Sequence, residues 1–241
     1  MRKPIIKALS AVAFAAFFCM GCGDNSTGGG DGDNEPAETN KTPGPATPDK
    51  TKFTDERDGI EYNKVTIGKQ VWMAENLNYA GEDDDNEIGV CFYNETPYCD
   101  LYGRLYDWNT VMDGASSSSA VPSKVRGICP AGWHLPSDAE WTVLTDYVGG
   151  EWTAGSKLRS TTNWYSYGNG TDEYGFTAMP GGIRFTDGNF TNTGNYGYWW
   201  STTEKSGTAY VWYRSMVFHN GRMNRYDGNK ASMFSVRCVK D

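Results

Sequence analysis

The middle of the chain carries the clearest helical pattern of polar and apolar positions. Ser137 and Glu140 form an S-x-x-E capping box, in which each side chain can hydrogen-bond the backbone amide of the other residue. Three apolar residues then recur at the spacing of one helix face: Trp141, Leu144 and Val148. Gly149 and Gly150 follow as a stop signal. The pattern predicts a helix that begins at Asp138 and ends at these glycines.

Short runs rich in aromatic and β-branched residues predict strands. Residues 65–73 (VTIGKQVWM) read as two strands joined by a turn at Gly68 and Lys69. Three later runs are also predicted as strands: residues 198–204 (YWWSTTE), 209–218 (AYVWYRSMVF) and 234–241 (FSVRCVKD). Both faces of residues 210–218 are apolar, which is typical of a strand inside a sheet.

A second helix is predicted over residues 101–112, where four apolar residues have helical spacing: Leu101, Leu105, Trp108 and Met112. Tyr102 and Gly103 leave open a strand at the start of this segment. Residues 149–198 show little periodicity and many glycine- and asparagine-rich turns, so we expect a long irregular region. Two helices, this irregular region and the late strands together predict an α+β domain.

The first 22 residues have the pattern of an export signal. Three basic residues, Arg2, Lys3 and Lys7, precede an apolar run from Ala8 to Phe18 that is too short to span a membrane. The run ends in CMGC, residues 19–22, which resembles a bacterial lipobox with Cys22 as the lipidated residue. An ordinary signal peptide cut nearby is the alternative. Gly23 stands where an aspartate would resemble an inner-membrane retention signal, so we expect an outer-membrane or cell-surface lipoprotein.

Composition divides the remaining chain into a tether and a domain. Between Gly23 and Lys52 the only hydrophobic residues are two alanines, so this segment has nothing to bury in a core. We predict a cleaved signal peptide over residues 1–21, a lipidated tether over 22–52 and one folded domain over 53–241.

The acidic balance of the chain limits its partners. The formal net charge is −8, whereas nucleic-acid binding relies on lysine and arginine contacts to phosphates. Electrostatic adhesion to an anionic lipid surface is disfavoured for the same reason. We therefore expect no nucleic-acid partner, and a membrane partner only through acylated Cys22.

Four further cysteines fit an exported protein: Cys91, Cys99, Cys129 and Cys238. They allow three pairings, of which we favour a local Cys91–Cys99 bridge and a long Cys129–Cys238 bridge. These four cysteines form no C-x-x-C motif, and the only histidines of the chain are His134 and His219. We therefore expect no metal site and no cofactor.

Eight blocks along the chain together resemble one known family. In order, they read DGIEYNKVTIGKQVWMAENLNYA, YGRLYDWNTVM, CPAGWHLPSDAEWTVLTDYVGG, AGSKLRS, YGFTAMPGGIR, DGNF, GYWWSTTE and FSVRCVKD. The blocks run from Asp58 to Asp241 and resemble the Fibrobacter succinogenes major paralogous (FISUMP) domain. This resemblance implies an exported lipoprotein, and it supplies no catalytic residues.

Two shorter resemblances imply a fold. GWHLPSDAEW, residues 132–141, is similar to a block of the formylglycine-generating, sulfatase-modifying family, and WWSTTE and VRCV are similar to the end of C-type-lectin-like domains. Together they imply a C-type-lectin-like fold, with two helices, a long loop region and a mostly antiparallel sheet closed by the two chain ends. In such a fold the Cys129–Cys238 pair is a long staple to the last strand.

An enzyme like the formylglycine generator is one interpretation. That chemistry uses two neighbouring cysteines in the C-terminal part to hold copper, but here only Cys238 lies beyond Cys129. His134 stands where that family has arginine, and we interpret it as a side chain that hydrogen-bonds a turn. The sequence shows no Ser-His-Asp signature, phosphate loop or cluster of metal ligands. We therefore expect no catalytic residues.

A binding module is the interpretation that the sequence favours. Lectin-like folds place ligands on their long loops, here residues 151–198, which are rich in aromatic, asparagine and aspartate residues. Five residues are predicted to contact the ligand: Trp164, Tyr165, Tyr167, Asn169 and Asp172. Aromatic rings stack on apolar sugar faces or anchor protein partners. We expect a non-catalytic recognition module for polysaccharide or a secreted protein, with a ligand-free structural protein of the cell envelope as the alternative.

Overall fold

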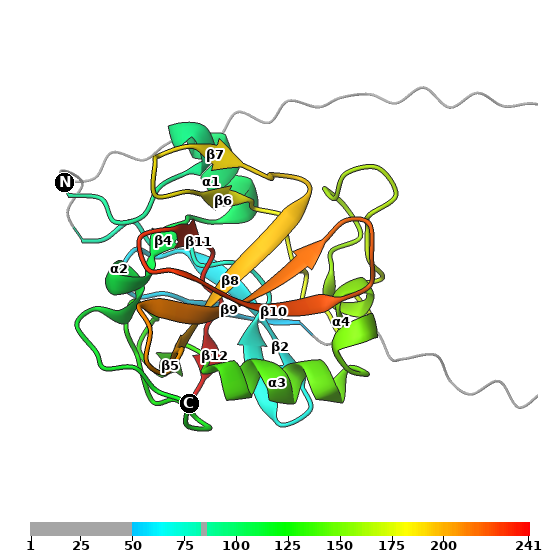
Figure 1. Ribbon diagram of the computed structural model, residues 1–241, viewed down its shortest axis with the longest axis horizontal. Coiled ribbons are helices and arrows are strands. Elements are labelled where there is room, and N and C mark those ends of the chain that lie inside the picture. Colours follow the sequence, from blue (N-terminus) through cyan, green and yellow to red (C-terminus); the bar gives the residue numbers. More distant parts are fainter. Residues whose placement is uncertain (1–49, 83–85) are drawn as a thin grey trace, which may run out of the picture. The chain divides into compact units, whose positions relative to one another are not determined.

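A computed structural model describes residues 50–82 and 86–241 (Figure 1). The predicted signal peptide, the lipidation residue Cys22 and nearly all of the tether lie outside the described residues. β1 (Thr51–Thr54) includes Thr51 and Lys52, the last two residues of the predicted tether. Among the described residues, no helix is long and apolar enough to cross a membrane.

Five antiparallel strands form the sheet that contains the first and the last strand of the domain. β2 (Glu61–Ile67) and β3 (Gln70–Met73) are the hairpin that the sequence predicts around Gly68 and Lys69. The sheet order is β1-β2-β3-β12-β5, where β12 is Val239–Lys240 and β5 is Trp133–His134. The last strand of the chain therefore lies between the predicted hairpin and the segment that precedes the central helix.

The remaining strands form two further sheets. β8 (Tyr196–Glu204), β9 (Tyr210–Val217) and β10 (Met223–Asn229) form an antiparallel sheet with β9 in the middle, which confirms the interior strand predicted at residues 210–218. The sequence pattern does not predict β10, because MNRYDGN reads as a polar turn. The third sheet has the order β4-β11-β6-β7, with the bounds Tyr106–Asp107, Met233–Phe234, Ile183–Arg184 and Phe190–Thr191.

The helices are short: η1 (Phe92–Asn94), α1 (Thr96–Tyr102), α2 (Trp108–Met112), α3 (Asp138–Tyr147) and α4 (Glu151–Leu158). The prediction of one helix over residues 101–112 is wrong, because α1 ends at Tyr102 and a new helix begins at Trp108. Gly103 adopts a positive φ of 74°, which ends α1. Asp107 then caps α2 by accepting hydrogen bonds from two amides of its first turn.

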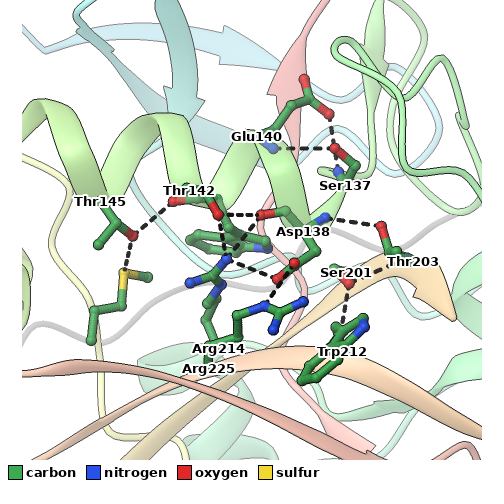
Figure 2. Close-up of polar contacts among 12 residues, drawn as sticks. Ser137, Asp138, Glu140, Thr142, Thr145, Ser201, Thr203, Trp212, Arg214 and Arg225 are labelled. Atoms are coloured by element: carbon green, nitrogen blue, oxygen red, sulfur yellow. Dashed lines mark hydrogen bonds and ion pairs between the residues drawn. The ribbon is translucent and has the colours of Figure 1, made fainter. Parts of the chain in front are cut away.

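The start of α3 is held by the predicted capping box and by two arginines (Figure 2). Ser137 Oγ accepts a hydrogen bond from the Glu140 amide at 3.1 Å, and the Glu140 carboxylate accepts one from the Ser137 amide at 3.0 Å. Asp138 forms ion pairs with the buried Arg214 of β9 and with Arg225 of β10, each at 2.8 Å. Burial lowers the pKa of Arg214, and the charge of Asp138 opposes that shift. These ion pairs fix α3 on the second sheet.

Helix α4 lies inside the segment that the sequence predicts to be irregular, so that prediction is wrong over Glu151–Leu158. Its buried residues are mostly small, which is why the sequence shows no clear apolar stripe. Gly155 shows the reason for small residues here, because a Cβ at this position would lie 2.2 Å from the Arg222 carbonyl oxygen. The helix therefore packs directly against the backbone of the β9–β10 connection.

Both favoured disulfides are present, Cys91–Cys99 and Cys129–Cys238. Cys129 comes shortly before β5 and Cys238 directly before β12, so the long bridge joins segments that lead into neighbouring strands of the first sheet. The mostly antiparallel sheets, the short helices and the two disulfides confirm the predicted α+β class.

Candidate ligand-binding groove

A groove of about 410 Å³ lies between the η1–α1 segment and the turn that follows β7. Its lining is mainly aromatic on the first side and mainly polar on the second: Phe92, Tyr93, Tyr98, Tyr102, Phe190, Thr191, Asn192, Thr193 and Gly194. In Figure 1 these segments lie side by side, with α1 behind β7 and β6. The groove therefore joins residues that lie about ninety positions apart in the chain.

The sequence CFYNETPYC, residues 91–99, builds the aromatic wall. The Cys91–Cys99 bridge closes this short loop, and a proline in the first turn of α1 favours the helix start. Tyr98 and Tyr102 are one helical turn apart on α1, and their rings lie nearly parallel, with centroids 6.2 Å apart and an angle of 17° between planes. Two ring planes of similar orientation thus form one side of the groove.

Phe92 is the buried ring against which the other aromatic rings of the groove pack. It is buried, and its ring contacts three other rings, with centroids 4.5 Å from Tyr93, 5.5 Å from Tyr98 and 5.2 Å from Phe190. Gly182, with φ 72°, lets β6 approach this cluster, because a Cβ there would lie 2.8 Å from the Phe92 ring and 2.6 Å from the Thr191 carbonyl oxygen. The positions of the rings are therefore set by packing.

Three residues at the groove have left-handed backbone conformations: Tyr93 (φ 54°), Asn94 (φ 58°) and Asn192 (φ 69°). Asparagine tolerates this region, but a bulky tyrosine does so at an energetic cost. The conformation places Tyr93 at the surface with 56% of its area exposed, although its ring contacts Phe92, Tyr98 and Phe190. A strained residue that exposes an aromatic ring is typical of a functional site.

The polar wall offers neutral hydrogen-bonding groups. Asn192 Nδ2 donates to the Tyr198 hydroxyl at 2.9 Å, which leaves the amide oxygen of Asn192 facing the Thr191 hydroxyl at 3.4 Å. The Tyr198 hydroxyl is protonated at neutral pH, because the ordinary pKa of tyrosine already lies well above 7 and burial raises the pKa of Tyr198 further. Among the described residues, none of those that line the groove carries a charge.

Only some of the five predicted contact residues have exposed side chains that are free to bind. Trp164 is a core residue in the structure, because it is buried and its Nε1–H donates to the Ala178 carbonyl oxygen at 3.0 Å. Tyr165 and Tyr167 are exposed, as expected of contact residues, by 63% and 101% of their reference areas. The structure thus separates Trp164 from the two tyrosines.

The two polar residues of the predicted set shape their own loop. Asn169 Oδ1 accepts from the Trp164 amide at 3.1 Å. Asp172 has a positive φ of 47°, and its carboxylate accepts from the amide and the hydroxyl of Thr177 at 2.6 and 2.7 Å. Lys50 Nζ also lies 3.4 Å from this carboxylate. Asp172 therefore has partners within the chain.

Residues 92–102 supply one side of the groove, and the sequence pattern predicts no contact residue there. The available signal is the occurrence of three aromatic residues inside the nine-residue disulfide loop, Phe92, Tyr93 and Tyr98. The other half falls within residues 151–198, where we expected the ligand-contacting loops.

His134 lies on β5, at the edge of the first sheet, and is buried between two carboxylates. Its Nδ1 is 2.7 Å from Asp241 Oδ1, and its Nε2 is 2.8 Å from Glu140 Oε1. The expected hydrogen bond to a turn is therefore replaced by two contacts with acidic side chains. Burial alone would lower the pKa of His134, but the hydrogen bonds and charges of Glu140 and Asp241 outweigh it and raise that pKa. Both of these partners are carboxylates, and neither is a hydroxyl or thiol that the imidazole could activate.

The stability of the fold is expected to fall at alkaline pH because of His134. Its pKa in the folded state exceeds about 6.5, the value for an unfolded chain, so the stabilisation is complete below that pH and is lost as pH rises through the folded pKa. Urea unfolding at pH 6 and pH 9 should show a larger loss for the wild type than for His134→Gln, which cannot be protonated. Equal losses would contradict this role.

Cys129 and Cys238 are bonded to each other and are not free to bind a metal. In residues 50–82 and 86–241, no three His, Cys, Asp or Glu side chains are grouped so that they could hold a metal ion.

Comparison with known proteins gives one family. No curated protein and no solved structure matches the chain. The Fibrobacter succinogenes major domain matches residues 65–240, a range that contains every residue lining the groove. The match confirms the resemblance to the FISUMP blocks, whereas the resemblance to C-type-lectin-like domains stays a prediction. The chain belongs to the Fibrobacter succinogenes major domain family.

Proposed function

We propose that this protein is a non-catalytic recognition module that binds a neutral polysaccharide in the aromatic groove. The observation that carries the proposal is the combination of exposed rings and uncharged polar side chains in one groove on an acidic protein. Sugar rings have apolar C–H faces that pack on aromatic rings, while their hydroxyl groups hydrogen-bond to amide and hydroxyl side chains. The Tyr98–Tyr102 wall and the 191–193 turn supply these two kinds of contact.

The electrostatics of the groove favour a neutral ligand over a charged one. Recognition of an acidic polymer or an acidic peptide relies on arginine or lysine. The described lining residues include neither, and the chain as a whole has a formal net charge of −8. A stable protein interface typically buries about 800 Å² on each side, so a protein partner would have to contact surface well beyond the nine residues that line this groove. A secreted protein is therefore the less favoured of the two expected ligands.

Replacing Tyr93 by glycine is expected to weaken binding with little change in stability. Glycine adopts the φ of 54° without strain, which offsets the lost ring contacts, so the free energy of unfolding should stay within about 1 kcal/mol of the wild type. The loss of an exposed ring should weaken binding at least about tenfold, or 1.4 kcal/mol. Affinity electrophoresis in neutral β-glucan, xylan, galactomannan and hydroxyethyl cellulose measures the binding, and polygalacturonate serves as the charged comparison.

Tyr226→Ala is the matched control, because Tyr226 is also an exposed tyrosine but lies on β10 in the second sheet. This variant should bind as the wild type does. The proposal is wrong if the neutral polysaccharides retard Tyr93→Gly as strongly as the wild type. It is also wrong if only polygalacturonate retards the wild type. A protein that no polysaccharide retards would support the structural alternative.

We also propose that the module is exported and held at the outer membrane or cell surface by acylated Cys22. The basic start, the short apolar run and the glycine before Cys22 support this proposal. Cys22→Ser should move the protein from the membrane fraction to the soluble fraction, or leave its signal peptide uncut. Unchanged partitioning into detergent would show that Cys22 is not the anchor.

A further inference from the structure

Another cavity, of about 430 Å³, lies at the edge of the first sheet where β5 meets the end of the chain. Its lining includes two basic residues, Lys124 and Arg126, and the buried Trp133. β5 and the end of the chain lie on the other side of the domain from β7 and α1 (Figure 1). The cavity shares no residue with the aromatic groove, so a ligand bound here would be independent of the polysaccharide site proposed above.

Both basic residues of this cavity are held near their backbones and have no acidic partner. Arg126 Nε donates to the Cys129 carbonyl oxygen at 3.2 Å, which orients the guanidinium and leaves its two terminal nitrogens free. Lys124 follows Ser123, whose amide donates to Glu140 Oε2 at 3.0 Å. Within residues 50–82 and 86–241, neither cation forms an ion pair. Two free cations on a chain with a formal net charge of −8 therefore face one cavity.

Trp133 brings an unpaired N–H donor to the same cavity. Only 4% of Trp133 is exposed, and its ring stacks on Phe53 with centroids 4.3 Å apart. Each of the other buried tryptophans in the described part of the chain donates its indole N–H to an oxygen: Trp72, Trp108, Trp141, Trp164, Trp199 and Trp200. Trp133 Nε1–H has no such acceptor, and the atom stays accessible to solvent. It is therefore free to donate to a ligand.

The third basic residue of the cavity, His134, is already occupied. Its Nδ1 lies 2.7 Å from Asp241 Oδ1 and its Nε2 lies 2.8 Å from Glu140 Oε1, so neither ring nitrogen is free. Lys124 and Arg126 supply the two free cations, and the Asp241 carboxylate lies in the same cavity. A phosphate dianion brings a third oxygen and a second charge, which makes it costlier to desolvate beside that carboxylate. A single carboxylate, with two oxygens, matches the donors that remain.

We infer that this cavity binds a small organic monocarboxylate. The ligand carboxylate accepts from the terminal nitrogens of Arg126, whose fork matches the spacing of two carboxylate oxygens, and from Lys124 Nζ and Trp133 Nε1–H. Pro122 and the Trp133 ring give the carbon body of the ligand an apolar surface. A volume of 430 Å³ suits a small molecule, because ligand pockets measure about 300–1,000 Å³.

Titration of the isotope-labelled protein with glucuronate and with benzoate tests the site, read from the indole N–H signal of Trp133 and the amide signal of Arg126. At least one of these acids should shift both signals saturably. The neutral counterparts, the methyl ester of glucuronic acid and benzamide, should not. Arg126→Gln should weaken the binding at least about tenfold, because hydrogen bonds to charged groups contribute about 1.5–3 kcal/mol.

Lys124→Gln keeps the test decisive if Arg126→Gln fails to fold. The Lys124 side chain has no partner in the described part of the chain, so this variant should fold normally and bind the acid more weakly. Lys69→Gln removes an exposed lysine from the first hairpin and is the matched control, which should bind as the wild type does.

Three results would overturn the inference: no saturable shift at Trp133 with either acid, equal shifts with the neutral counterparts, or unchanged affinity in Lys124→Gln. Inorganic phosphate that binds more tightly than both acids would show that the site selects phosphate and would overturn the assignment to a carboxylate. Saturable binding of glucuronate alone would support a sugar acid as the ligand, whereas binding of benzoate alone would support an apolar acid.

Discussion

Replacing Arg237 with methionine is expected to lower the free energy of unfolding by at least about 3 kcal/mol. Arg237 is fully buried, and its guanidinium donates to the carbonyl oxygens of Met73, Phe176 and Thr177 and to Asn76 Oδ1. Burial lowers its pKa to about 9, so the group is still charged at neutral pH. Methionine fills similar space but donates nothing, and each buried acceptor left without a donor costs about 1–3 kcal/mol.

Two further variants show whether the hydrogen bonds cause that loss. Arg237→Lys keeps the charge but cannot reach all four acceptors, so its loss of stability should lie between those of the wild type and Arg237→Met. Lys69→Met removes a cation from the exposed turn of the first hairpin and should change stability by less than about 0.5 kcal/mol. Urea unfolding measures all three, and an Arg237→Met variant as stable as the wild type would show that the acceptors need no donor.

Removing the Cys129–Cys238 bridge should cost about 5 kcal/mol. The bridge closes a loop of 109 residues, and the chain-entropy estimate for such a loop is about 4.8 kcal/mol. The Cys129→Ala, Cys238→Ala double variant should therefore unfold at a much lower urea concentration. The Cys91→Ala, Cys99→Ala double variant provides the comparison, because the estimate for its separation of 8 residues is about 2.5 kcal/mol.

The comparison of the two double variants also tests how the bridges act. Loss of the short bridge should affect binding more than loss of the long one, because the short bridge closes the loop that carries Phe92 and Tyr93. Equal losses of stability for the two pairs would mean that loop length does not determine their contribution. Unchanged binding without the short bridge would mean that packing alone holds the aromatic wall.

The features predicted well from sequence depend on neighbours along the chain. The capping box needs only Ser137 and Glu140, three residues apart, and the first hairpin needs only a two-residue turn between apolar strands. The interior position of β9 follows from apolar residues on both of its faces. In each case the residues that form the structure are the residues that carry the pattern.

The features that the sequence did not predict depend on distant partners. Trp164 stands in an asparagine-rich turn beside two exposed tyrosines, and only the positions of Arg159 and Ala178 show that its ring points inward. The groove is assembled from residues 92–102 and 190–194, and neither segment shows a pocket by itself. Helix α4 packs through Gly155 against a backbone that no local pattern reveals.

Amide chemical shifts of the isotope-labelled protein, titrated with a neutral β-1,4-linked hexasaccharide, test the central claim most directly. Binding in the groove predicts that the largest shifts occur at Tyr93, Thr191 and Gly194, with none at Trp212 on the second sheet. Saturable shifts centred on Trp212, or no saturable shift at the three groove residues, would contradict it.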